Sequence, residues 1–244
     1  MATNLGEISL RPELPNRTRG PVRAVYLIAV LWALSARFAL ACETTTATAE
    51  ATSAELRSTF QEKGLRVVTF IGYSGAEYED PTRMLRLADQ VLDEFSPANT
   101  VINIGATAVG IGAVYEIAKR RGFQTIGIVS AQAKVDRVPL SPCVDRVFYI
   151  QDQTWGGFLP GTALLSPTSL AMVEVSDALF AIGGGEIGRD ELHGALQRGK
   201  RVQFFPADMN HAIARERART RGLALPTDFR GAAASLFARN AEKQ

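Results

Sequence analysis

Short apolar runs alternate along this chain with segments whose apolar residues recur at helical spacing. Continuous apolar runs that end in glycine or polar residues are typical of strands buried on both faces of a parallel sheet. The strands predicted in this way are Leu65–Ile71, Thr100–Ile104, Gln124–Val129, Val147–Ile150, Ala178–Ile182 and Val202–Phe205. The alternation predicts the α/β class, with a doubly wound parallel sheet in a single domain over residues 54–240.

Capping residues mark where several of the helices begin. Thr52 and Glu55 have the spacing of a capping box, before a helix that we expect to end near Lys63. Asp80 and Pro81 are expected to cap and start a helix reaching about Phe95. Further helices are expected after Gly112 as far as Arg121, over Thr168–Val175, from Arg189 onward, over Met209–Gly222 and over Asp228–Arg239.

Three of the predicted strands end in glycine-rich turns, at residues 72–75, 105–112 and 183–188. The carboxyl ends of parallel strands share one edge of the sheet, where ligands of such folds bind. Glycine lets backbone N–H groups approach an anion, and a following helix adds the positive end of its dipole. The predicted phosphate-binding residues are Gly72, Ser74, Gly75, Gly105, Thr107, Gly110, Gly112, Gly183, Gly184, Gly185 and Gly188. The alternative is a set of tight turns without a ligand.

Composition narrows the class of ligand. The chain has 244 residues, of which 46% are apolar and 21% charged, as expected for one globular core. Its formal net charge of +2 comes from an arginine-rich amino-terminal segment, because the rest of the chain is close to neutral. A near-neutral body without basic runs gives no support for a nucleic-acid-binding surface, so the partner expected at the glycine turns is a small molecule that carries phosphate.

The first 41 residues resemble a secretory signal peptide. Arg17, Arg19 and Arg23 precede the apolar stretch Ala24–Ala36, and Ala39-Leu40-Ala41 has the form of a cleavage site. We therefore expect an exported, periplasmic protein, or one anchored to a membrane through a lipid on Cys42. The alternative is a cytoplasmic protein whose start has been assigned too far upstream.

Residues 42–53, rich in Thr, Ala and Glu, are expected to form a flexible tether. Two cysteines, Cys42 and Cys143, are too few for a disulfide framework. Cys143 has no basic neighbour closer than Arg146, which predicts a free thiol in a loop rather than a nucleophile.

The glycine turns also carry a family resemblance. Phe70–Gly75, the turn at 105–112 and the segment 183–192 resemble the LOG-like (lysine-decarboxylase-like) proteins of the SLOG superfamily of Rossmann-like nucleotide binders. That family's motif is P-G-G-x-G-T-x-x-E. Gly184 and Gly185 match its paired glycines and Glu191 its glutamate. The resemblance implies a homodimer, and a Glu191 that assists cleavage of the N-glycosidic bond of a nucleoside 5′-monophosphate.

The chain departs from this motif at positions that matter for catalysis. Gly183 replaces the proline, and Ile187-Gly188 replaces the Gly-Thr pair. Thr168 and Ser169 stand where the enzymes have arginine and lysine, so a cation that would stabilise the transition state is missing. Arg189 could substitute for that charge, or could be a solvated helix residue.

The apolar faces of Ala113–Ala118 and Asp228–Arg239 are the expected dimer contacts. Trp155 either stacks on a ligand base or packs within the fold or against a second subunit. Asp208, Asn210 and His211 are expected to cap a helix, and neither a metal nor a resident cofactor is predicted.

Two classes of function follow, and a third alternative remains. The first is a nucleotide-binding or sensing module without efficient catalysis, and the second is a phosphoribohydrolase-like enzyme that uses Glu191. The third is an NAD-type dinucleotide binder, because Gly183, Gly185 and Gly188 also match G-x-G-x-x-G, with Asp208 at the end of the next strand.

Overall fold

The computed structural model describes residue 42 and residues 46–241. The predicted signal segment therefore lies outside the described residues.

The centre of the fold is a seven-stranded sheet in the order β1-β5-β4-β3-β2-β6-β7, with every strand parallel to its neighbours. The strands are β1 (Ala47–Glu50), β2 (Arg66–Gly72), β3 (Thr100–Asn103), β4 (Gln124–Ser130), β5 (Arg146–Ile150), β6 (Ala178–Ile182) and β7 (Arg201–Phe205). From β2 the sheet extends in one direction through β3, β4 and β5, and in the other through β6 and β7. The switch between the two directions therefore lies between β2 and β6, where open α/β sheets bind ligands.

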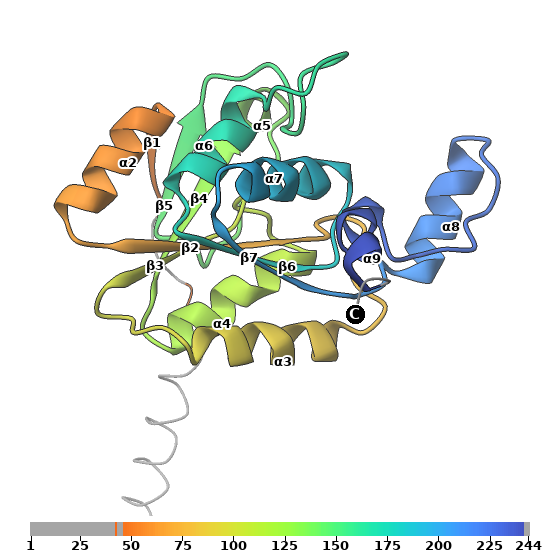
Figure 1. The fold of residues 1–244 in the computed structure, drawn as a ribbon, viewed down its shortest axis with the longest axis horizontal. Coiled ribbons are helices and arrows are strands. Elements are labelled where there is room, and N and C mark those ends of the chain that lie inside the picture. The colour runs from red at the N-terminus through yellow and green to blue at the C-terminus, as the bar shows by residue number, and fades with distance from the viewer. Residues whose placement is uncertain (1–41, 43–45, 242–244) are drawn as a thin grey trace, which may run out of the picture. The chain divides into compact units, whose positions relative to one another are not determined.

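Helices cover both faces of the sheet, as Figure 1 shows. On one face lie α3 (Pro81–Leu92) and α4 (Val114–Arg120), whose buried side chains join the larger core cluster. On the other lie α2 (Ser53–Glu62), α6 (Pro167–Val175) and α7 (Glu186–Gln197). The predicted α/β doubly wound, Rossmann-like class is confirmed.

The remaining helical segments are short or peripheral. They are η1 (Gly110–Ala113), α5 (Gln132–Val135), α8 (His211–Thr220), η2 (Ala232–Ala234) and α9 (Ser235–Ala241). The helix expected over Asp228–Arg239 is thus a later and shorter pair, η2 and α9. The predicted caps are present, because Thr52 and Glu55 form the reciprocal capping box of α2 and Asp80 accepts from Arg83 N–H.

The expected tether is wrong over residues 47–50, which form strand β1. Ala47–Glu50 pairs with Arg146–Tyr149 of β5, and Ala47 N–H donates to Asp145 O at 3.0 Å. All four side chains of β1 are exposed, so backbone hydrogen bonds rather than apolar burial hold it at the sheet edge. A prediction based on hydrophobic pattern could not detect such a strand.

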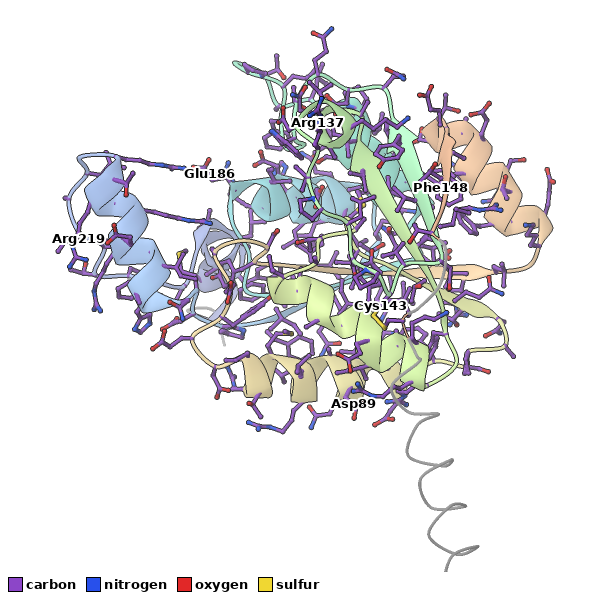
Figure 2. All side chains as sticks on the ribbon, turned by 180° about the vertical axis from the view of Figure 1, so that it is seen from behind. Asp89, Arg137, Cys143, Phe148, Glu186 and Arg219 are labelled. Atoms are coloured by element: carbon purple, nitrogen blue, oxygen red, sulfur yellow. A yellow bond between two sulfur atoms is a disulfide. The ribbon has the colours of Figure 1, made fainter. Side chains whose placement is uncertain are left out.

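The prediction of a free thiol at Cys143 is also wrong, since Cys42 and Cys143 form a disulfide across 101 residues, with Cα atoms 4.3 Å apart. Figure 2 shows this bond at the labelled Cys143. A lipid anchor would need a thioether on the same Cys42 sulfur, and the disulfide-bonded protein has no thiol there. The expected anchor at Cys42 is therefore incompatible with this structure.

Candidate functional site

A cavity of about 680 Å³ lies at the carboxyl edge of the sheet, beside the switch between β2 and β6. Its walls come from the turns after β2 and β3, the end of β4, the start of α7, and parts of α6 and α8. Eight of the residues predicted from sequence line it, namely Gly72, Ser74, Gly75, Gly105, Thr107, Gly185, Gly188 and Glu191. The three glycine turns therefore do converge.

The other four predicted glycines lie outside this lining and pack against the chain itself. A Cβ at Gly183 would lie 2.5 Å from Tyr73 Cε2, and one at Gly184 would lie 3.2 Å from Ala233 Cβ. Gly110 and Gly112 lie against backbone carbonyls, those of Tyr73 and Ser74 and that of Thr107 respectively. Their lack of a side chain makes room for the protein's own atoms rather than for a ligand.

The first turn of α7 opens on the cavity with its backbone donors uncapped. Gly185 is the N-cap residue, in extended conformation, and within the described part of the chain no side chain caps this turn. A Cβ on Gly185 would meet nothing within 4 Å. The free N–H groups and the helix dipole make this the natural place for an anion. Glu186 follows as an exposed carboxylate on the cavity wall, which restricts where a phosphate can lie.

Two hydroxyl groups lie together where the turns after β2 and β3 meet. Ser74 Oγ and Thr107 Oγ1 are 2.8 Å apart, and both residues line the cavity. Each hydroxyl can donate or accept, so the pair adds neutral hydrogen-bonding capacity to the glycine turns.

Glu191 is buried on α7 and bonded to α6. Ser169 Oγ donates to Glu191 Oε1 at 2.7 Å and accepts from Gly157 N–H at 2.8 Å. Burial raises the pKa of Glu191 to about 7 and nearby Asp190 adds to this, while the bond from Ser169 opposes it. The side chain is therefore a titrating acid near neutral pH. Ser169 stands where the LOG-like enzymes have lysine, and no spacing in the sequence predicted its hydrogen bond to Glu191.

Thr168 is a buried polar residue next to Ser169, the hydrogen-bond partner of Glu191. Thr168 is 5% exposed and lines the cavity, and within the described residues its Oγ1 has no hydrogen-bond partner. Its backbone N–H donates to Asp152 Oδ2 at 2.9 Å. The Oγ1 atom is itself buried, so this hydroxyl presents no surface to a ligand in the cavity.

Trp155 forms part of the cavity wall and is 47% exposed. The loop that carries it is anchored by Asp152, whose Oδ1 accepts from Thr154 N–H at 2.8 Å. A large aromatic surface, half open to solvent at a cavity, suits stacking on a planar group.

The arginines that line the cavity are not Arg189, the one considered from the sequence. Arg189 Nη2 pairs with Asp190 Oδ1 at 2.8 Å and does not line the cavity. Arg217 and Arg221 do line it, reaching it from α8 and its C-cap. No local pattern distinguished them from the other arginines of this arginine-rich helix.

The position of Asp208 does not support the alternative of an NAD-type dinucleotide binder. Asp208 lies outside the cavity lining, with Oδ2 3.3 Å from His211 Nε2. Asn210 caps α8, as expected, by accepting from Ile213 N–H at 3.0 Å. Within residue 42 and residues 46–241, no three His, Cys, Asp or Glu side chains cluster in a way that could hold a metal ion.

The apolar faces expected at a dimer contact are largely used within the chain. Val114, Tyr115 and Ala118 of α4 are buried in the main core. Phe237 of α9 stacks on Phe204 of β7 with ring centroids 4.6 Å apart. The dimer stays a prediction. In the described part of the chain, no helix is both long and apolar enough to span a bilayer.

Neither a family model nor a curated protein matches this sequence. Solved structures with similarity include the molybdenum cofactor carrier protein of Chlamydomonas reinhardtii, at 19% identity over 57% of this chain and 76% of that one, with a TM-score of 0.41. The molybdenum cofactor binding protein of Rippkaea orientalis matches at 21% identity, with the same coverages and TM-score. The protein TM1055 matches at 19% identity over 57% and 72% of the two chains, with a TM-score of 0.42. The fold class stated above rests on the strand order of this chain itself.

The elevated pKa of Glu191 predicts a pH-dependent stability. The folded protein binds the proton of Glu191 more tightly than the unfolded chain does. The stability that this protonated side chain gives the fold is therefore fully present below the unfolded pKa of 4.5, and it is lost as pH rises through about 7. Glu191→Gln keeps a neutral group that can accept from Ser169. We therefore expect the free energy of unfolding of Glu191→Gln, relative to that of the wild type, to rise by roughly 2–3 kcal/mol from about pH 5 to about pH 8, as measured by urea denaturation.

The matched control is Glu186→Gln, which removes a carboxylate from the exposed first turn of the same helix and leaves the contribution of Glu191 in place. A Glu191→Gln profile parallel to that of the wild type would show that Glu191 ionises normally in the folded protein.

Proposed function

We propose that this chain is a SLOG-type, LOG-like protein that binds a nucleotide or a nucleotide-derived ligand in the cavity, without efficient catalysis. The observation that carries this proposal is the uncapped first turn of α7, which opens on a cavity at the switch point of a parallel sheet. The positive end of the α7 dipole and the free backbone N–H groups of its first turn therefore face a space that no side chain at Gly185 occupies.

The size and lining of the cavity support a nucleotide in particular. A volume of about 680 Å³ lies within the usual range for small-molecule sites. Part of the lining is cationic, from Arg217 and Arg221, and part is apolar, from Trp155 and Met172. A ligand with a phosphate and a planar base has matching chemistry at both parts.

A binding or sensing role is favoured over catalysis because Glu191 forms no ion pair with a cation among the described residues. Its side chain bonds to neutral Ser169, and Arg189 is paired with Asp190. Cleavage of an N-glycosidic bond develops charge on the departing groups, and such reactions depend on preorganised charges to stabilise it.

The phosphoribohydrolase-like alternative is retained for one specific reason. A buried carboxyl in a cavity, with its pKa raised to about 7, is the kind of group that enzymes use as a general acid or base.

We also propose that the protein is exported. A disulfide between Cys42 and Cys143 is typical of proteins that fold in an oxidising compartment, and it supports the signal-peptide interpretation of the amino-terminal segment. A cytoplasmic location remains the alternative.

Gly185→Asp tests the anion site at α7. Both Asp and Asn are favourable N-cap residues, and the space around Gly185 is open, so Gly185→Asp and Gly185→Asn should fold equally well. We expect the Asp variant to bind AMP on the order of 10–100-fold more weakly than the Asn variant, measured by isothermal titration calorimetry, because a carboxylate repels phosphate. Equal affinities of the two variants would contradict an anion site there.

Release of adenine from AMP separates the binding module from the enzyme. We expect the wild-type protein to bind AMP but to release adenine, measured by chromatography, far more slowly than the roughly 1–1000 per second of ordinary enzymes. Turnover in that range, lost in Glu191→Gln while AMP binding is retained, would instead establish the enzymatic alternative.

Export predicts that the mature protein begins at Cys42. Amino-terminal sequencing of protein from the native host should give Cys42 first, and non-reducing mass spectrometry should find it bonded to Cys143. Intact Met1 on protein recovered from the cytosol would overturn the proposal.

A further inference from the structure

Arg217 and Arg221 bring two guanidinium groups to one wall of the cavity. They are four residues apart, in the last turn of α8 and at its C-cap, so their side chains leave the helix on the same face. Arg217 Nη2 donates to Gly75 O at 2.6 Å, which places its guanidinium at the glycine turn after β2. Figure 2 shows α8, with Arg219 labelled, beside the end of α7 that carries Glu186.

Gly75 makes room for this arginine. A Cβ at residue 75 would lie 3.1 Å from Arg217 Nη2, closer than most side chains approach one another. Gly75 therefore allows a cation to lie directly against the turn that ends β2.

The charge of these two arginines is not neutralised by the described part of the chain. Among those residues, neither Arg217 nor Arg221 has a carboxylate within ion-pair distance, whereas Arg219 on the same helix pairs with Glu216 at 3.3 Å. Apart from these two arginines, the charged residues of the lining are Glu186 and Glu191. At a pH near 7 or below, much of Glu191 is neutral, so the wall of the cavity carries excess positive charge.

The donors around this wall suit one kind of group. Two guanidinium groups, the first turn of α7 and the Ser74–Thr107 hydroxyl pair line the same cavity. Guanidinium groups bind phosphate through parallel, charge-assisted hydrogen bonds, and a terminal phosphate is the dianion that balances two of them.

We propose that Arg217 and Arg221 bind the phosphate of the ligand and make the site specific for a phosphomonoester over the corresponding nucleoside. This inference rests on the proposed nucleotide-binding function. It assigns the positive charge of the site to α8 of the same chain, on the side of the cavity formed by Gly75, rather than to residues 168 and 169 of α6.

The test compares AMP with adenosine by isothermal titration calorimetry, in the full chain with its disulfide intact. Arg217→Gln should weaken AMP binding about 10- to 100-fold and change adenosine binding by less than about twofold, because only AMP carries the charged group. Arg221→Gln should act in the same direction, and Arg217→Lys should recover part of the loss. The matched control, Arg219→Gln, removes a charge from the same helix outside the cavity and should bind AMP as the wild type does.

Each other outcome has a definite meaning. If the wild type binds AMP and Arg217→Gln binds it equally well, or loses AMP and adenosine affinity alike, the assignment of Arg217 is overturned and the nucleotide site stands. If the wild type binds neither AMP nor adenosine but binds inorganic pyrophosphate in an Arg217-dependent way, the anion site stands and the nucleotide function fails. If none of the three binds, both proposals fail.

Discussion

Two tyrosine hydroxyl groups at the end of β2 hold the carboxyl edge of the sheet together. Tyr78 Oη accepts from Tyr73 N–H at 3.1 Å and donates to Ile182 O at 2.8 Å, which joins the turn after β2 to the last residue of β6. Tyr73 Oη donates to Arg230 O at 2.6 Å and so connects the same turn to the carboxyl-terminal segment. The two rings contact each other edge to face, with centroids 5.2 Å apart. The site depends on this arrangement because these contacts fix the turns that line it.

The tyrosines also explain which glycines are free to meet a ligand. The ring of Tyr73 occupies the space beside Gly183 and Gly231, both of which have positive φ. Gly185, two residues after Gly183, faces open space. The glycine run 183–185 therefore has two roles. Gly183 makes room for the Tyr73 ring, and Gly185 leaves the first turn of α7 uncapped. The same tyrosine contacts hold the segment after α8 and so help to fix the helix that carries Arg217.

The sequence predicted features that depend on local pattern and missed those that depend on distant contacts. Strands β2 to β7 were predicted to within about one residue, and for β2 to β6 the reason is that burial on both faces imposes a continuous apolar run. Strand β1 was missed because it buries no side chain and is held mainly by backbone hydrogen bonds to β5. Glycine triplets do not reveal whether a ligand or a tyrosine ring will fill the space beside them. Ser169 and Glu191, like Gly75 and Arg217, meet only through the tertiary fold, so no local spacing could identify these pairs.

The place of β1 in the sheet has a consequence for how the chain assembles. It is the first strand in the sequence, yet its only partner among the described strands is β5, and the disulfide beside it joins residues 101 positions apart. During synthesis, the first strand must wait until nearly two-thirds of the chain has emerged before it can pair. Until then, the backbone groups of β1 have no partner in the sheet, and an open strand edge readily pairs with another molecule. The covalent bond between Cys42 and Cys143 joins a residue before β1 to a residue before β5, and so keeps the two strands together once β1 has docked. Strand β1, held in place in this way, covers the edge of β5 and becomes the edge strand of the sheet on that side.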